Sequence, residues 1–281
     1  MIIVKHPAEL NRHLSELKSL HASTGFVPTM GALHAGHVSL VRQARNDNGI
    51  CVVSVFVNPR QFNDQSDLAK YPRTPEKDLE ILEAEGVDIV FMPDAEDIYP
   101  DKSRNSFDLA GLDRIMEGYF RPGHFDGVAD VVYRLFNMVK PDRAYFGEKD
   151  FQQLLVIRQM TKSENLDVEV IGIPIVREAD GLAMSSRNQR LSEQGRRHAP
   201  VIYRVLRHTS ETFPALTPSE LKSEIIRQID DNELLSCEYV EIVDEDSMQI
   251  TDNWQGGNAF RICVAVWCED VRLIDNIALT K

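Results

Sequence analysis

Cysteine, basic charge and long apolar runs are scarce in this sequence of 281 residues. The four cysteines form no CxxC pair and two lie in apolar runs typical of buried strands, so we expect reduced core thiols. The chain has 31 basic and 44 acidic residues, and the formal charge of −13 argues against a nucleic-acid partner. No run has the length of a membrane span and the first residues show no signal-peptide pattern, so we expect a cytoplasmic protein without a membrane partner.

Short apolar runs alternate with helical patterns through the first half of the chain. The apolar runs lie at residues 25–27, 50–57, 87–92 and 168–176. Between two of them, Thr74 and Pro75 are expected to begin a helix that ends near Gly86. A second helix is expected from Val128, with an apolar stripe that continues to Val139 and packs in the core. This alternation predicts βαβ units and a mainly parallel sheet, an α/β fold.

The pattern changes after about residue 176. A basic helix is expected over residues 192–213, and a capping box at residues 217–220 opens another. Strand-like runs follow at residues 237–243, 259–268 and 272–277. Helices followed by consecutive strands predict a smaller α+β domain. With a turn in the READG segment, we place the domains at residues 1–178 and 179–281.

The segment PTMGALHAGH, residues 28–37, follows the first expected strand. Gly31 and Gly36 allow the backbone to approach a ligand closely, and a helix beginning near His37 would direct its positive end at a phosphate. His34 and His37 are three residues apart and would lie on one side of a helical turn. A solvated helix or a metal site can show the same HxxH pair, although no third zinc ligand follows at a recognisable spacing.

Three further polar clusters have both a functional and an ordinary interpretation. In GEKD, residues 147–150, a lysine can neutralise a phosphate and an aspartate can hold magnesium, yet such a turn can simply start a helix. In MSSRN, residues 184–188, hydroxyls and an arginine can bind a polyphosphate, or form a polar loop. In NPRQF, residues 58–62, Asn58 and Gln61 suit a small polar substrate at a strand end, or a turn.

Together these segments resemble the pantothenate synthetases, a family of the HIGH-type nucleotidyltransferase superfamily. PTMGALHAGH, VFVNPRQF, YPRT, RPGHFDGV, GEKDFQQL and MSSRN occur in the family's order over essentially the whole chain. The resemblance implies a Rossmann-like domain that binds ATP and pantoate, a smaller C-terminal lid, a homodimer and a requirement for Mg²⁺. It also implies condensation of pantoate with β-alanine through a pantoyl adenylate, with release of AMP and pyrophosphate.

The resemblance also carries residue roles, which remain expectations here. His34, His37, Lys149 and Arg187 would act at the phosphates. Gln61 and Gln153 would hold pantoate, with Asn58 nearby. Which carboxylate holds the metal is open between Asp150 and Asp78. The ATP site would be lined by Met30, Gly31, His34, Gly36, His37, Gly147, Glu148, Lys149, Asp150, Val176, Met184, Ser185, Ser186 and Arg187.

One position departs from the family. Asp130 stands where a threonine is common, and we expect its carboxylate to face either solvent or the substrate cleft.

The motifs leave two rival functions open. A cytidylyl- or adenylyltransferase would release a nucleotidyl conjugate rather than free AMP. An aminoacyl-tRNA synthetase fragment or RNA-binding module is disfavoured by the acidic balance and by MSSR in place of a lysine-rich loop. Basic residues are concentrated in one place, and we expect them to form a solvated or intersubunit face. They are Arg196, Arg197, Arg204 and Arg207.

Overall fold

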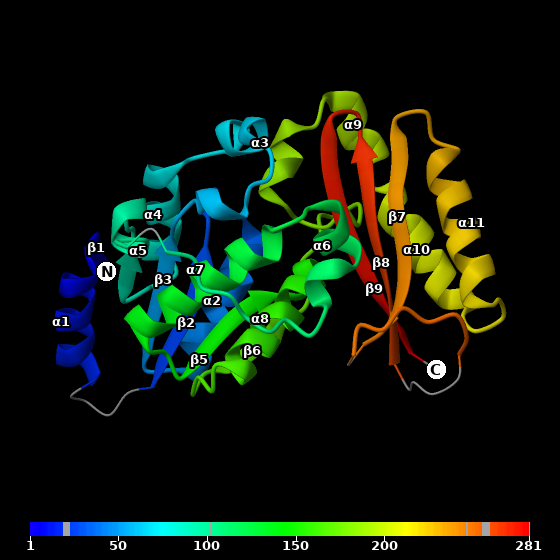
Figure 1. Ribbon diagram of the computed structural model, residues 1–281. Coiled ribbons are helices and arrows are strands. Elements are labelled where there is room, and N and C mark those ends of the chain that lie inside the picture. The colour runs from blue at the N-terminus through cyan, green and yellow to red at the C-terminus, as the bar shows by residue number, and fades with distance from the viewer. Residues whose placement is uncertain (19–22, 102, 246, 255–258, 281) are drawn as a thin grey trace. The chain divides into compact units, whose positions relative to one another are not determined.

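The structure is a computed structural model that describes residues 1–18, 23–101, 103–245, 247–254 and 259–280. The chain divides into two compact units, Met1–Pro174 and Ile175–Lys281 (Figure 1). The division therefore falls slightly earlier than the boundary expected after residue 178.

The first unit contains a six-stranded sheet in which every pair of neighbours is parallel. The strands in sheet order are β1 (Ile2–Val4), β4 (Ile89–Phe91), β3 (Ile50–Val55), β2 (Thr24–Thr29), β5 (Arg143–Gly147) and β6 (Glu169–Ile173). From β2 the chain proceeds to β3 and β4 on one side, and later to β5 and β6 on the other. The order thus reverses between β2 and β5, and such a switch point is where open α/β sheets bind ligands.

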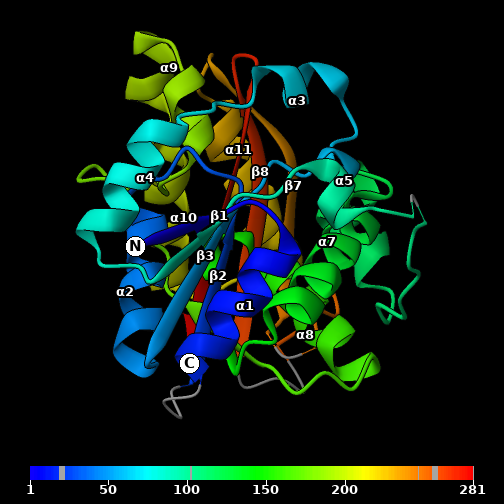
Figure 2. The same cartoon turned by 90° about the vertical axis from the view of Figure 1, so that its left-hand side faces the viewer.

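Helices cover both faces of this sheet, which explains why β3 is buried along nearly its whole length. In Figure 2, α2 (Ala35–Asp47) and α4 (Pro75–Ala84) lie on one side of the strands. On the other side are α1 (Pro7–Lys18), α7 (His124–Val139) and α8 (Phe151–Ser163). The apolar stripe expected to run from Val128 to Val139 is buried on α7. The expected parallel α/β architecture is confirmed.

Short elements complete the first unit. They are η1 (Pro59–Gln61), α3 (Gln65–Lys70), α5 (Ala95–Ile98), η2 (Leu112–Arg114), α6 (Met116–Phe120) and η3 (Glu148–Asp150). Helix α4 starts where expected, with Thr74 at the N-cap and Pro75 first, but Thr74 makes no side-chain cap bond. Its hydroxyl donates to Asp78 Oδ1 at 3.1 Å. Gly86 follows the helix with φ of +71°, the left-handed conformation expected of a C-terminal cap.

The second unit is a three-stranded antiparallel sheet backed by helices. The order is β7 (Leu235–Asp244), β8 (Ala259–Cys268) and β9 (Val271–Thr280), drawn from orange to red in Figure 1. Helices α10 (Val201–Thr212) and α11 (Pro218–Asp230) pack their apolar sides on this sheet to form a separate core. The capping box of α11 is present as expected. The smaller α+β domain is confirmed.

The single helix expected over residues 192–213 is wrong. The structure has η4 (Ser186–Arg190), then α9 (Glu193–His198), then α10 from Val201. Pro200 separates the last two because proline has no N–H to donate and its ring crowds the preceding turn. The apolar run at 168–176 likewise forms a strand only as far as Ile173, since Pro174 follows.

Three of the four cysteines are buried in the fold. Cys51, Cys263 and Cys268 are buried, and Cys237 is half-buried. Burial raises the pKa of Cys51 to about 12.

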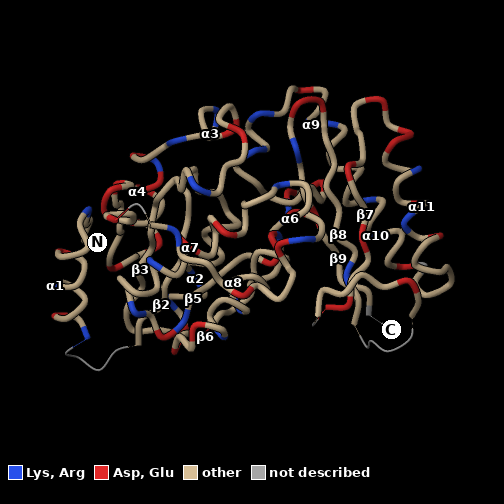
Figure 3. The backbone as a smooth tube through the Cα atoms, in the orientation of Figure 1, with Lys and Arg blue, Asp and Glu red and all other residues tan. Residues whose placement is uncertain are grey.

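Among the residues that the structure describes, no helix combines the length and apolar character needed to cross a membrane. Acidic and basic segments alternate along the backbone in both units (Figure 3).

Candidate active site

Three polar segments meet at the carboxyl edge of the parallel sheet. Residues 30–37 follow β2, residues 58–61 follow β3, and residues 148–150 follow β5. These strands are neighbours in the sheet, in the order β3-β2-β5. Pairing between β2 and β5 covers only Gly25 and Phe26 of β2. The segments therefore surround the switch point, where the two strands are no longer paired.

The two histidines cap the start of α2. The helix begins at Ala35, slightly before the expected start near His37, so His34 is the N-cap. The Nδ1 atom of His34 accepts a hydrogen bond from the Gly36 N–H at 3.1 Å. The Nδ1 atom of His37 accepts one from the His34 N–H at 3.3 Å, and the ring centroids are 4.1 Å apart. Because Nδ1 accepts in both rings, each neutral imidazole carries its proton on Nε2.

The surroundings keep both rings neutral. Burial lowers the pKa of His34 to about 4, and the positive charge of Lys149 adds to this effect. Burial lowers the pKa of His37 to about 3, with further contributions from His34 and Lys149. Lys149 lies 3.7 Å from the carboxylate of Asp150, measured from Nζ to Oδ2. The structure thus brings four of the expected site residues together as two neutral donors beside a cation and a carboxylate.

The loop between β2 and α2 is fastened by Asp78 of α4, whose side chain is buried. Its Oδ2 atom accepts from the Ala32 N–H at 2.9 Å and its Oδ1 atom from the Leu33 N–H at 2.8 Å. Gly31 has φ of +79°, and a Cβ there would lie 2.9 Å from Asp78 Oδ2. Glycine is thus required here by backbone conformation and by this contact, in addition to any approach of a ligand.

A second network surrounds Gln61 after β3. Asn58 Nδ2 donates to Gln61 Oε1 at 3.1 Å, and Gln61 Nε2 contacts Met30 Sδ at 3.0 Å. The backbone carbonyl of Gln61 accepts from His124 Nδ1 at 2.8 Å. Asn58 and Gln61 are both buried. The structure therefore joins Asn58, Gln61 and Met30, three of the expected site residues.

Two neighbouring glutamines on α8 differ in their surroundings. Gln152 is buried and holds the segment around η2 and α6: its Nε2 atom donates to the carbonyls of Leu112 and Ile115, and its Oε1 atom accepts from the Glu117 N–H. Gln153, the expected pantoate ligand, is half-buried in the first turn of α8. Gln152 therefore has a structural role that the sequence motif does not distinguish from that of its neighbour.

Val176 and residues 184–187, which are also expected at the ATP site, belong to the second unit. The Met184 N–H donates to the Val176 carbonyl at 3.0 Å, so these two residues are adjacent. Ser185 caps η4 by accepting from the Arg187 N–H at 3.3 Å, and Ser186 is buried. The 184–188 segment is therefore an ordered turn with a short 3₁₀ helix.

Asp130 occupies neither of its two expected environments. Its side chain is 2% exposed and lies between two arginines, with 2.7 Å to Arg60 Nη1 and 2.8 Å to Arg134 Nε. Asn105 Nδ2 donates to the same carboxylate at 2.8 Å. The negative charge is compensated inside the first unit, because an unpaired buried carboxylate would be costly.

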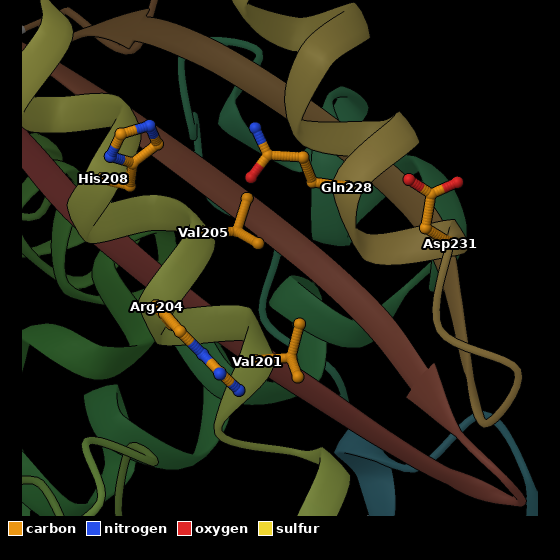
Figure 4. Close-up of a pocket in the computed structure, with 6 residues that line it drawn as sticks. All are labelled: Val201, Arg204, Val205, His208, Gln228 and Asp231. Carbon is orange, nitrogen blue, oxygen red and sulfur yellow. The ribbon is translucent and has the colours of Figure 1, made fainter.

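The second unit has a surface pocket between α10 and α11 (Figure 4). It contains none of the expected catalytic or substrate residues. Its lining is Val201, Arg204, Val205, His208, Gln228 and Asp231. Three of the four arginines of the expected basic face, Arg196, Arg197 and Arg207, are paired with carboxylates at 2.5, 3.4 and 3.1 Å.

Residues 2–278 match the model of the pantoate-beta-alanine ligase family. A pantothenate synthetase from Bacteroides fragilis is 50% identical, with 99% of this chain and 98% of that protein covered. The crystal structure of a pantothenate synthetase from Thermus thermophilus superposes with a TM-score of 0.92 at 42% identity, with 100% of both chains covered.

The chain belongs to the pantoate-beta-alanine ligase family. A further solved member is the ligase from Francisella tularensis in complex with "Beta-gamma ATP" and β-alanine. It superposes with a TM-score of 0.81 at 37% identity, with 99% of this chain and 97% of that chain covered. The family and the ligase class expected from the motifs are confirmed.

Sequence reasoning missed the residues that support the site from a distance. Asp78 was considered only as a metal ligand, and Tyr99, whose hydroxyl contacts Asn58, was not considered. Neither residue lies within the sequence motif of the residues that it contacts, and only the YPRT segment shortly before Asp78 offered any signal. Within the part of the chain that the structure describes, no cluster of three or more histidine, cysteine or acidic side chains is placed to hold a metal ion.

Proposed function

We propose that this chain condenses pantoate with β-alanine to form pantothenate, using ATP and passing through a pantoyl adenylate. The observation that carries the proposal is the pair of neutral Nε2–H imidazoles at the switch point, next to Lys149. Family membership indicates that the substrates are pantoate and β-alanine. The Francisella ligase, solved with an ATP compound and β-alanine, supports the same two ligands here.

In the first step, a carboxylate oxygen of pantoate attacks the α-phosphorus of ATP. A bond forms between that oxygen and phosphorus, and the bond from the α-phosphorus to the β-phosphate oxygen breaks. Pyrophosphate leaves with the electron pair. A carboxylate needs this step because oxide is too poor a leaving group for an amine to displace at neutral pH.

The histidines contribute hydrogen bonds to the phosphates. Each ring accepts at Nδ1 from a backbone N–H near the start of α2 and donates at Nε2, so it extends the positive end of the helix toward a ligand. A neutral donor fixed in this way stabilises charge that develops on the phosphate oxygens without reorganising. The ammonium of Lys149 adds a full positive charge to the same region.

In the second step, the amine of β-alanine attacks the acyl carbon of the adenylate. The C–N bond forms, the bond from carbon to the AMP oxygen breaks, and the amine loses a proton to solvent. AMP leaves with the electron pair. No side chain forms a covalent bond to the substrate in this scheme.

Of the two carboxylates considered for magnesium, Asp150 suits the ion better. Its side chain is 46% exposed and next to Lys149, whereas both oxygens of Asp78 already accept hydrogen bonds. Magnesium commonly binds through one or two carboxylates together with substrate phosphates and waters. When bound, it would balance charge on the phosphates of ATP.

The other assignments stay predictions that rest on the family resemblance. They are a pantoate contact at Gln153, ATP contacts along residues 147–150, a homodimer and a cytoplasmic location. In the second unit, Val176 and Met184 to Arg187 are predicted to contact ATP, with Ser186 and Arg187 at the phosphates.

The decisive experiment measures AMP, pyrophosphate and pantothenate from the purified chain with ATP, pantoate and β-alanine, omitting each in turn. We expect all three products in equal amounts only in the complete mixture. Pantoate alone should support exchange of labelled pyrophosphate into ATP, because the adenylate forms before β-alanine reacts. A nucleotidyl conjugate as the final product would instead favour a nucleotidyltransferase.

A further inference from the structure

A continuous chain of contacts leads from the buried carboxylate of Asp130 to the side-chain amide of Gln61. Asp130 pairs with Arg60, whose guanidinium carbon lies 3.6 Å from the centre of the Tyr99 ring. The Tyr99 hydroxyl donates to Asn58 Oδ1 at 2.7 Å. Asn58 Nδ2 then donates to Gln61 Oε1 at 3.1 Å.

Two backbone groups favour the same orientation of the Asn58 amide as the Tyr99 hydroxyl does. Asn58 Oδ1 accepts from the Arg60 N–H at 3.1 Å, and Asn58 Nδ2 donates to the Gly127 carbonyl at 3.0 Å. Turning the amide over would place an N–H against an N–H and an oxygen against an oxygen. With Asn58 fixed, Gln61 must present its oxygen to Asn58 and keep its NH₂ group for other partners.

Tyr99 completes this arrangement from the chain that follows β4. The residue is 7% exposed, and burial together with the Asp130 carboxylate raises the pKa of its hydroxyl. The hydroxyl therefore stays protonated and donates. The guanidinium of Arg134 lies 5.2 Å from the ring centre, so two cations held by Asp130 contact one aromatic ring.

We propose that Tyr99, held by Arg60, Asp130 and Arg134, is a positioning residue that orients Gln61 so that its NH₂ group donates to an oxygen of the substrate. The inference rests on the proposed function, which supplies pantoate as that substrate. At present the Gln61 NH₂ group contacts the Met30 sulfur, a weak acceptor that a carboxylate or hydroxyl oxygen would replace. An amide fixed in this orientation favours substrates that offer an oxygen acceptor and disfavours those that offer an ammonium.

The test replaces Tyr99 by phenylalanine, which keeps the ring beneath both arginines and removes only the hydroxyl. Tyr145→Phe is the matched control: Tyr145 is also buried, and its hydroxyl contacts Asn48 and Asp47 at the far end of α2. We expect Tyr99→Phe to raise the KM for pantoate by about 3- to 10-fold, the effect of one hydrogen bond, with the KM for ATP unchanged. Tyr145→Phe should alter neither KM.

A second measurement follows Gln61 itself by NMR of its side-chain ¹⁵NH₂ group, assigned with Gln61→Asn. The two amide protons should be distinct and slowly exchanging in the wild type, and should shift and exchange faster in Tyr99→Phe. Asp130→Asn, if it folds, should act in the same direction, because it releases Arg60.

The outcomes separate the inference from the proposed function. A wild type that makes no pantothenate overturns the function, and the NMR comparison then decides the inference alone. An active wild type with an unchanged KM for pantoate in Tyr99→Phe, or an unchanged Gln61 signal, overturns the inference. Equal increases in the KM for pantoate and for ATP would also overturn it, because they would indicate general loss of structure.

Discussion

At the scale of single residues, the tautomers of the two imidazoles of the site depend on hydrogen bonds between the backbone and their Nδ1 atoms. Each Nδ1 atom accepts a backbone N–H, so the tautomer is set by the start of α2 rather than by a ligand. His124, which supports Gln61, has the opposite tautomer, because its Nδ1 atom must donate to a carbonyl. Burial, together with the charge of Arg121, lowers the pKa of His124 to about 4.

These three histidines predict a loss of stability at mildly acidic pH. A histidine whose pKa is lower in the folded chain than in the unfolded chain takes up its proton only on unfolding. Below the unfolded value of about 6.5, each such residue makes the free energy of unfolding fall by up to about 1.4 kcal/mol per pH unit. The three together would give about 4 kcal/mol per unit between pH 6 and pH 4.5.

The variant His124→Asn tests this, because asparagine can still donate to the Gln61 carbonyl but does not titrate. Urea unfolding between pH 7 and pH 4.5 should show a slope smaller by about 1.4 kcal/mol per pH unit than in the wild type. His6→Asn is the control, since His6 is exposed next to Asp97, which raises its pKa. An unchanged slope in His124→Asn would show that this ring already titrates in the folded chain.

Asp78 and Asp150 should respond differently to replacement by asparagine. Asp78→Asn removes an acceptor from a backbone N–H and should lower the Tm and raise the KM for ATP about 10-fold or more, since bonds to a carboxylate contribute about 1.5–3 kcal/mol. The Mg²⁺ concentration for half-maximal activity should stay the same. Asp150→Asn should instead raise that concentration about 10-fold, with little change in Tm.

Asp88→Asn is the control for the stability effect. Its carboxylate also accepts a backbone N–H, from Cys51 at 2.8 Å, but at the start of β3 and not in the loop that follows β2. It should lower the Tm without raising the KM for ATP. A Mg²⁺ requirement that changes in Asp78→Asn and not in Asp150→Asn would reverse the metal assignment.

The sequence predicted the contacts of these residues only where the two partners are close together in the chain. The HxxH spacing placed two imidazoles on one helical turn, and both are there. Asp78 contacts a loop 46 positions earlier in the chain, and Tyr99 contacts a residue 41 positions earlier. Such pairs are determined by sheet order, which the spacing of motifs does not contain.

At the scale of elements, the fit between α7 and η1 determines where the Gln61 backbone lies. Gly127 permits this fit, because a Cβ there would meet the Arg60 carbonyl oxygen at 2.4 Å and the Gln61 Cα at 2.9 Å. Both neighbours are backbone atoms and cannot move aside as the end of a side chain can. The helix and the turn therefore have to approach closely for Asn58 to contact the Gly127 carbonyl.

Gly127→Ala should consequently displace η1. We expect a loss of about 1–3 kcal/mol of stability from overpacking and a higher KM for pantoate, measured by thermal unfolding and steady-state kinetics. Gly111→Ala is the control: its φ is +81°, but nothing lies within 4 Å of its Cβ position. It should cost stability through backbone strain alone. A Gly127→Ala variant with unaltered kinetics would show that η1 tolerates the displacement.

Strong apolar runs predicted elements well, and weaker ones did not. The runs that became β2, β3 and β4 were expected, whereas β1 and β5 were not. Strand β5 contributes only Ala144, Tyr145 and Phe146 as buried residues between a charged start and Gly147. Pro200 and Pro174 ended elements that periodicity alone would have continued, because a missing N–H outweighs the apolar pattern.

At the scale of the whole molecule, the boundary between the units depends on contacts distant in sequence. The READG turn begins at Arg177, whose guanidinium binds Asp275 of β9 at 2.7 Å, 98 positions later. The turn is thus fastened into the second unit, which begins at Ile175. The sequence located the change of pattern but not this attachment.

Each unit has its own buried core, and this predicts that a cavity in one core weakens that unit first. Ile225 is fully buried in the core formed by α10, α11 and the antiparallel sheet. Ile225→Ala should cost about 2–5 kcal/mol. Hydrogen–deuterium exchange should then speed up in β7, β8 and β9 more than in β2 and β3, because opening of the second unit leaves the parallel sheet intact.

Leu82→Ala is the reciprocal variant, since Leu82 is fully buried in the core of the first unit. It should increase exchange in β2 and β3 and leave β8 protected. Equal loss of protection in both units, from either variant, would mean that the chain unfolds as one cooperative body, and the two cores would then be parts of a single folding unit.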